Sequence, residues 1–161
     1  MFPEYGKKIP FTIENYAYRD SFGRETVSWI RTFDSRKRRR FDAYMIYSES
    51  RGCVVDYLGS HQHLAVDLAL SVDERGGMCI RSGEQRFYEG RIAFRFPPFL
   101  TGVADVCEWF DDDAEKFRIE VNVTNRRWGR LFGYSGAFDA SYREARQVPS
   151  HITPMREERR E

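Results

Sequence analysis

Long apolar runs are absent from this sequence of 161 residues, and none approaches the roughly 20 residues that a membrane-spanning helix requires. We therefore expect no transmembrane segment. The first residues, MFPEYGKKIP, also lack the apolar core of a secretory signal, which favours a cytoplasmic protein. Neither sign of charge is in large excess, because 26 basic residues nearly balance 25 acidic ones. This balance argues against a dedicated nucleic-acid-binding protein, which normally carries a basic surplus.

Cysteine is scarce, and its spacing is uninformative. Cys53, Cys79 and Cys107 form neither an even set nor a closely spaced pair. Because free cysteines are commonly buried, we expect three reduced thiols within strands, and no disulfide framework, redox motif or cysteine metal site.

Motifs that bind nucleotides or activate a nucleophile are also missing. The sequence contains no G-x-x-x-x-G-K-[ST] loop, no G-x-G-x-x-G fingerprint and no G-x-S-x-G elbow. It therefore assigns neither a cofactor nor a catalytic residue, and any nicotinamide cofactor would have to be bound by another chain.

Alternation of apolar and polar residues is abundant, whereas no segment has a helical period over three turns. In the clearest stretch, 115–124, polar residues separate Phe117, Ile119, Val121 and Val123. Successive strand side chains point to opposite faces, so this pattern predicts a strand with one buried side. Similar stretches between Gly- or Asp-rich turns predict ten strands, at 11–19, 24–33, 40–48, 53–58, 63–72, 78–87, 92–96, 102–110, 115–124 and 131–142.

Ten short strands joined by tight turns predict an all-β fold with antiparallel neighbours. An open sheet of this size would leave exposed edges, so we predict an up-and-down, lipocalin-like barrel, with a coiled β-sandwich as the alternative. The β domain is expected at 1–145. The polar remainder, 146–161, is expected to be an irregular tail, and its charged stretch 156–161 a solvated end.

Several phrases carry a family resemblance: PFTIENYAYRDSFGRETVSWIRTF from Pro10, RRFDAYMIYSE from Arg39, LGSHQHLAVDLALSVDERGG from Leu58, RSGEQRFYEG from Arg81 and FRIEVNVTNRRWGRLFGYSGAF from Phe117. With these phrases the chain resembles an uncharacterised bacterial domain family of unknown function. Members of that family occur alone or appended to oxidoreductases of the saccharopine-dehydrogenase type. The resemblance implies a cytosolic or membrane-associated bacterial setting, a helical segment before the first strand and an oxidoreductase as a partner. It implies no catalytic residue.

The best candidate for a metal site is His61-Gln62-His63 with Asp67. If a strand begins at His61, residues 61, 63 and 67 share one face, and two imidazoles with a carboxylate suit a divalent metal. The alternative is that both histidines lie at a strand start, bonded to backbone or solvent. Two-residue spacings recur in any sheet, so this alternative is favoured.

The best candidates for ligand binding are Arg81, Arg86, Glu108 and Trp109. An inward-facing arginine, with Glu108 beside Trp109, could orient a polar ligand group inside an apolar cavity. The alternative is a solvated sheet face on which these charges form cross-strand ion pairs with neighbours.

Three functions remain open. The leading one is a binding module for an apolar small molecule. The second is an interaction module that accompanies an oxidoreductase or pairs with itself through the apolar 94–100 segment. The third is an enzyme, either metal-dependent through His61, His63 and Asp67 or with Glu108 as a base. The basic run 36–40 is interpreted as a hairpin tip.

Overall fold

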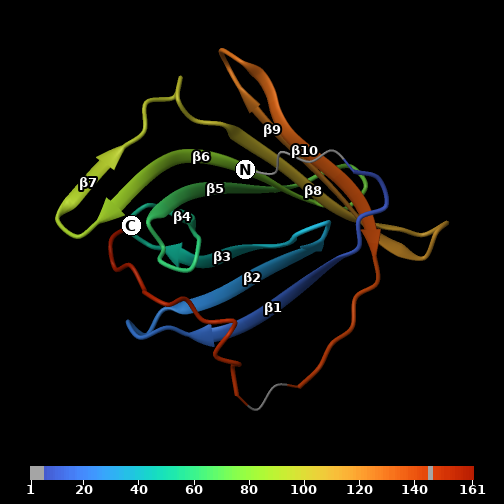
Figure 1. The fold of residues 1–161 in the computed structure, drawn as a ribbon, viewed down its shortest axis with the longest axis horizontal. Helices are drawn as coiled ribbons and strands as arrows, with labels where there is room; N and C mark the ends of the chain where they lie inside the picture. Colours follow the sequence, from blue (N-terminus) through green and yellow to red (C-terminus); the bar gives the residue numbers. More distant parts are fainter. Residues whose placement is uncertain (1–5, 145–146) are drawn as a thin grey trace. The chain divides into compact units, whose positions relative to one another are not determined.

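The computed structural model describes residues 6–144 and 147–161, and within these ranges it contains ten strands and no helix (Figure 1). Accordingly, no described segment could cross a membrane as a helix. The strands are β1 Phe11–Arg19, β2 Glu25–Asp34, β3 Arg38–Ser48, β4 Cys53–Leu58, β5 Leu64–Val72, β6 Met78–Glu89, β7 Ile92–Arg95, β8 Val103–Asp111, β9 Lys116–Asn125 and β10 Gly129–Phe138.

The strands follow one another in the sheet in the order β1-β2-β3-β4-β5-β6-β8-β9-β10, and β7 pairs separately with β6. The pairs with a determined register, from β1·β2 to β9·β10, are antiparallel. The predicted all-β class and up-and-down order are confirmed. Each predicted strand is present, with ends that differ by a few residues.

The turn between β1 and β2 shows how the sequence sets a hairpin. The Asp20 Oδ1 atom accepts hydrogen bonds from the backbone N–H groups of Phe22 and Arg24, at 3.0 and 2.8 Å. Gly23 has φ +78°, in the left-handed region that a side chain disfavours. The Asp and Gly residues that predicted this turn therefore stabilise it, Asp20 through its side-chain acceptor and Gly23 through its positive φ.

The chain divides into two compact units. Unit 1 contains the described parts of 1–66, 86–94 and 145–161, and unit 2 contains Asp67–Gln85 and Arg95–Glu144. Each of β5 and β6 contributes residues to both units.

The core of unit 1 lies on one face of β2, β3 and β4. Its buried members include Ile30, Tyr44, Val55 and Tyr57, and Ile152 from the segment 147–161 packs among them with no exposed surface. That segment is irregular, as predicted, but the expectation of a solvated end is wrong for Glu158, which is 5% exposed. Packing against the distant sheet buries this polar residue, which the local sequence alone predicts to be exposed.

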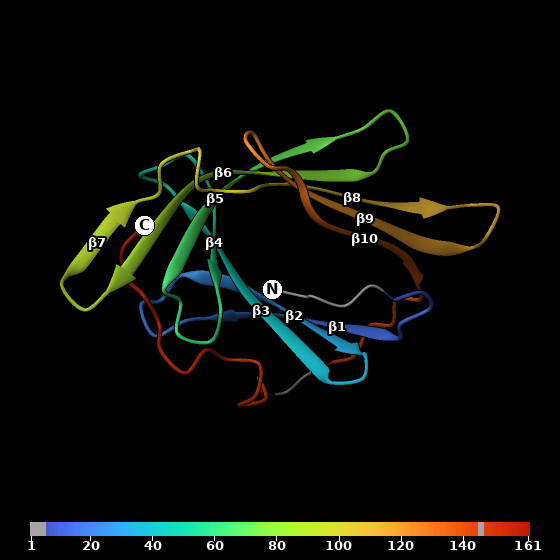
Figure 2. The same ribbon diagram turned by 45° about the horizontal axis from the view of Figure 1, so that its top comes forward.

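Unit 2 is built on β6, β8, β9 and β10, of which β8, β9 and β10 run side by side in Figure 2. In its register, Ile80 opposes Val106, and Val106 opposes Val121. These residues share one face, as the alternation in β9 predicted.

Two cysteines of unit 2 correct a prediction. Cys79 on β6 directly opposes Cys107 on β8, with the Cα atoms 4.2 Å apart, and the two form a disulfide. The expectation of three reduced thiols is therefore wrong for this pair, whereas Cys53 is free. The 28-residue separation concealed a contact that exists only because β8 pairs with β6.

Candidate functional site

A charged pair of the buried Asp56 and the partly buried Arg31 lies on the second face of β2, β3 and β4, opposite to the core of unit 1. In the register, Trp29 opposes Ala43, Arg31 opposes Phe41, and Asp56 opposes Met45. Because register partners share a face, these six side chains lie on one side of the three strands. We call Trp29, Arg31 and Asp56, the three of them that carry polar atoms, the Asp56 site.

Arg31 is held between two aromatic rings. Its guanidinium carbon lies 4.9 Å from the Trp29 ring centroid and 4.7 Å from the Phe41 ring centroid. Cation–π attraction at such distances is worth about 0.5–2 kcal/mol, more where water is excluded. The two rings therefore fix a positive charge over an apolar part of the sheet.

Asp56 is 7% exposed, and this burial raises the pKa of its carboxyl group to about 6. The charge of Arg31 and a backbone hydrogen bond from Tyr44 act in the opposite direction and favour the ionised form. A buried acid with a shifted pKa beside a specific charge partner is characteristic of functional sites.

Asp56 and Trp29 each have a buried polar atom without a hydrogen-bond partner in the described structure. The Oδ1 atom of Asp56 and the Nε1 atom of Trp29 are shielded from solvent, and neither makes a hydrogen bond. Leaving a buried polar group unpaired costs about 1–3 kcal/mol, so such atoms are rare in native proteins. One acceptor and one donor on the same apolar face are therefore available to a ligand.

The structure places the ligand residues predicted from the sequence on more than one face and in both units, and the ligand site stays a prediction. Arg81 is exposed and lies 3.4 Å from Asp105, and its face of unit 2 also carries Trp109. Glu108 is on the opposite face, between Met78 and Ile119. The alternation of β8 alone places these neighbours on different sides.

The remaining predicted ligand residue, Arg86, is 3% exposed and belongs to β6 in unit 1. Trp109 stacks instead with the guanidinium of Arg75, at 4.1 Å from the ring centroid. The ion pair of Arg81 fits the cross-strand alternative that the sequence left open.

The histidines of the predicted metal site lie close together. The His61 and His63 rings are nearly parallel with centroids 5.4 Å apart, and His63 Nδ1 lies 2.6 Å from a Glu89 carboxylate oxygen. However, β5 begins at Leu64, so His61 is in a turn, while Asp67 is further along β5 in unit 2. Among the described residues no three His, Cys, Asp or Glu side chains could hold a metal ion. The metal site stays a prediction.

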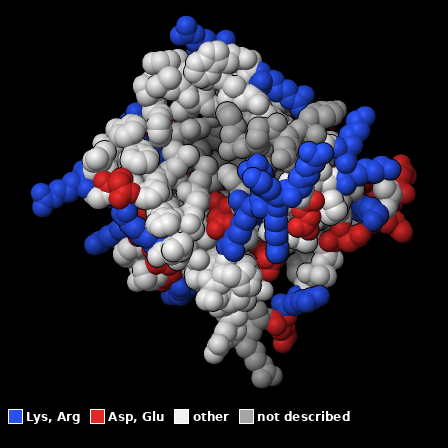
Figure 3. All heavy atoms as spheres, viewed as in Figure 1, with Lys and Arg blue, Asp and Glu red and all other residues white. Residues whose placement is uncertain are grey.

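The basic run 36–40 lies at the end of the β2–β3 hairpin, as predicted, with 36–37 in the turn and 38–40 at the start of β3. Arg38 lies 3.7 Å from Asp34, and Arg40 lies 2.6 Å from Asp42. Figure 3 shows Lys and Arg side chains interspersed with Asp and Glu on the face in view. The acidic residues at the strand ends thus partly neutralise this run.

The sequence contained one signal for the Asp56 site that our reasoning missed. Asp56 interrupts the apolar strand CVVDYL, and Arg31 lies two residues from Trp29 and from Phe33, which share its strand face. A charge at a position that strand periodicity assigns to a buried face points to a buried ion pair. Both faces of β4 are buried, so alternation alone could not identify which face carried Asp56.

Comparison with known proteins places the chain among relatives that have no assigned activity. The uncharacterized protein YndH of Bacillus subtilis (strain 168) is 38% identical over 146 residues, which cover 90% of this chain and 71% of that protein. No solved structure matches. A family described as a domain of unknown function, DUF4166, matches residues 1–138. The chain therefore belongs to the DUF4166 family.

Proposed function

We propose that this protein is a binding module for an apolar small molecule, which lies against the Asp56 site and hydrogen-bonds with Asp56 and Trp29. The observation that carries the proposal is the pair of unpartnered buried atoms, one acceptor and one donor, on an apolar and aromatic face. Ligand sites are mostly apolar and contain a few polar groups that orient the ligand.

The charges of the site restrict the ligand. Arg31 already provides a positive charge that favours ionised Asp56. A neutral ligand with a hydrogen-bond donor would satisfy the carboxylate without adding an unpaired charge to a buried site. A hydroxyl or N–H group on an otherwise apolar molecule has these properties. Arg86 and Glu108 stay predicted contributors, but the proposal does not depend on them.

The test is a fluorescence titration with N-phenyl-1-naphthylamine, a neutral apolar probe that carries one N–H donor. We expect saturable binding to the wild-type protein. Asp56→Ala should weaken this binding about 10-fold or more, because hydrogen bonds to charged groups contribute about 1.5–3 kcal/mol. Asp112→Asn, in the exposed turn before β9, is the matched control and should bind like wild type. Absence of saturable binding, or equal affinity of the Asp56 variant, would contradict the proposal.

A second candidate is an interaction module, with an oxidoreductase as the partner that the family resemblance implies. The observation that favours it is the outer strand β7 of unit 1, where Ile92 is 58% and Phe94 46% exposed. Exposed apolar side chains grouped on one short strand are typical of docking surfaces. Ile92→Lys with Phe94→Lys should abolish co-purification with such a partner but leave binding of the probe intact.

A cytoplasmic location is also part of this proposal, and the thiol state tests it. Disulfides rarely persist in the cytosol, so this location requires the facing cysteines Cys79 and Cys107 to be kept reduced in the cell. Thiol labelling in cell extracts prepared under acid quench would show a reduced pair if the protein is cytoplasmic.

A further inference from the structure

The segment 147–161, which we call the strap, covers the core face of unit 1 without forming a strand of the sheet. Ile152 enters the apolar cluster as a fully buried side chain, and Val148 packs against the same cluster. Between Pro149 and Glu161, no strap residue forms a ladder with β1–β6. The strap is therefore held by one fully buried apolar side chain, Ile152, by the partly buried Val148 and by polar contacts.

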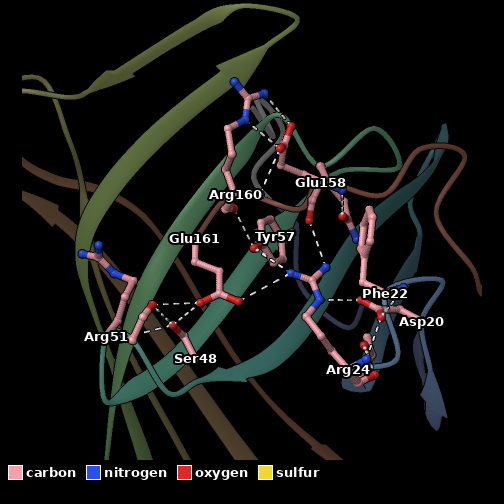
Figure 4. A network of polar contacts seen from close by, with 12 residues as sticks. Asp20, Phe22, Arg24, Ser48, Arg51, Tyr57, Glu158, Arg160 and Glu161 are labelled. Carbon is pink, nitrogen blue, oxygen red and sulfur yellow. Dashed lines mark hydrogen bonds and ion pairs between the residues drawn. The ribbon is translucent and has the colours of Figure 1, made fainter.

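The sheet supplies hydrogen-bond donors to oxygen atoms of the strap (Figure 4). The Tyr57 hydroxyl donates to the Arg160 carbonyl at 2.7 Å, and the Tyr88 hydroxyl donates to the Glu161 carbonyl at 3.0 Å. Ser48 also donates to the Glu161 carboxylate. These donors form hydrogen bonds with main-chain carbonyls and with one acidic side chain, as a peptide-binding groove does.

Arg24 is the central cation of this network (Figure 4). It donates to the Glu158 carbonyl at 2.9 Å, and one of its nitrogens lies 3.8 Å from the Glu161 carboxylate. Asp20, at 2.7 Å from Arg24 Nε, fixes the guanidinium in place. The site is thus preorganised by residues of the sheet and its turns.

Gln62 also holds the strap. Its side-chain oxygen accepts a hydrogen bond from the Glu158 backbone N–H at 2.6 Å, and Gln62 is 3% exposed. The residue has φ +53°, which is unfavourable for a side chain of this kind. Backbone strain of this type persists only where surrounding contacts enforce it, and it commonly marks ligand-holding positions.

Two observations indicate that the strap is distinct from the strands that it covers. The family match ends at residue 138, before the strap begins. Residues 139–144, which lead toward it, are exposed and have no regular structure. The strap is therefore joined to the strands by a stretch that makes little contribution to the fold.

We propose that the strap is an exchangeable peptide ligand held in cis. The face that it covers is then a binding site for extended peptide segments with an aliphatic anchor and a glutamate nine residues later, as Ile152 and Glu161 are spaced. This site lies on the opposite face of β2–β4 from the Asp56 site, so the two can be tested independently.

The test cuts the connection and leaves every contact in place. A recognition sequence for a site-specific protease is inserted after Ser141, beside Tyr142, which is 96% exposed. After cleavage of the folded full chain, native mass spectrometry should show the released strap piece still bound one to one. An excess of synthetic peptide 147–161 should then exchange into the complex.

Peptide variants test the anchor. Ile152→Ala in the synthetic peptide should weaken binding about 30-fold or more, which corresponds to about 2 kcal/mol. Met155→Ala is the matched control, because the Met155 side chain is 78% exposed, and it should bind like the unmodified peptide.

Three results would overturn the proposal. The cut strap could dissociate and fail to rebind, it could remain bound without exchanging, or its removal could unfold the strands as judged by circular dichroism. The last two results would make the strap an integral part of the core. Equal affinity of the Ile152→Ala and Met155→Ala peptides would likewise show that Ile152 does not anchor the peptide.

Discussion

Replacing Asp56 with Asn should stabilise this protein at neutral pH, although it changes a buried charged residue. Burial raises the pKa of Asp56 from its ordinary value of 3.8 to about 6 in the folded state. The folded protein therefore holds this proton more tightly than the unfolded chain does. An isosteric amide occupies the same volume without a charge to desolvate.

The magnitude follows from the difference of about two pKa units. Each unit corresponds to about 1.4 kcal/mol, so ionised Asp56 lowers the free energy of unfolding by about 3 kcal/mol. A raised folded-state pKa gives stability that is fully present below pH 3.8 and is lost as the pH rises through about 6. Most of the loss thus falls between about pH 4 and pH 7.

Urea unfolding followed by circular dichroism at pH 4.5 and pH 7.5 measures this effect. We expect Asp56→Asn to exceed wild type by about 1 kcal/mol at the lower pH and by about 3 kcal/mol at the higher pH. Asp112→Asn, at an exposed turn, provides the control for a change of net charge. If Asp56→Asn and wild type show the same pH dependence, or if the variant is less stable at pH 7.5, the assigned burial and pKa of Asp56 are wrong.

Three further predictions concern the core, the strap and the cysteines. In the intact chain, Ile152→Ala should lower the free energy of unfolding by about 2–5 kcal/mol in urea titrations, while Met155→Ala changes it by less than about 0.5 kcal/mol. Tyr57→Phe should cost about 1 kcal/mol in the same assay, because it leaves the Arg160 carbonyl and Arg24 without the hydroxyl, and an equal stability would contradict this contact. The oxidised, unfolded protein should contain one reactive thiol, Cys53, and reduction should expose three and lower stability by up to about 3–4 kcal/mol for a loop of this length.

The sequence predicted the strands well because their pattern is local. The alternation of Phe117, Ile119, Val121 and Val123 depends only on neighbouring residues, and β9 forms where it was expected. Turn residues such as Asp20 likewise act within four positions. These are the features that a single sequence displays directly.

The candidate sites were harder to predict because they depend on pairing between distant strands. Cys79 and Cys107 meet only after β7 is excluded from the main strand order, and the partners of Glu108, Met78 and Ile119, follow only from the register of β8. Ile152 gave no signal, because its stretch is mostly polar and its few apolar residues follow no strand or helix period. Tertiary packing determines its burial, and no local period records that packing.

Strand β4 has covered side chains on both of its faces, with Val55 and Tyr57 fully buried and Asp56 only 7% exposed. A strand without a solvent side has its backbone N–H groups shielded by packing from above and below as well as by the ladder. Such amides open only with the largest unfolding events and not with local fluctuations. The backbone amides of the short strand β4 are therefore expected to be the slowest of unit 1 to exchange with deuterium.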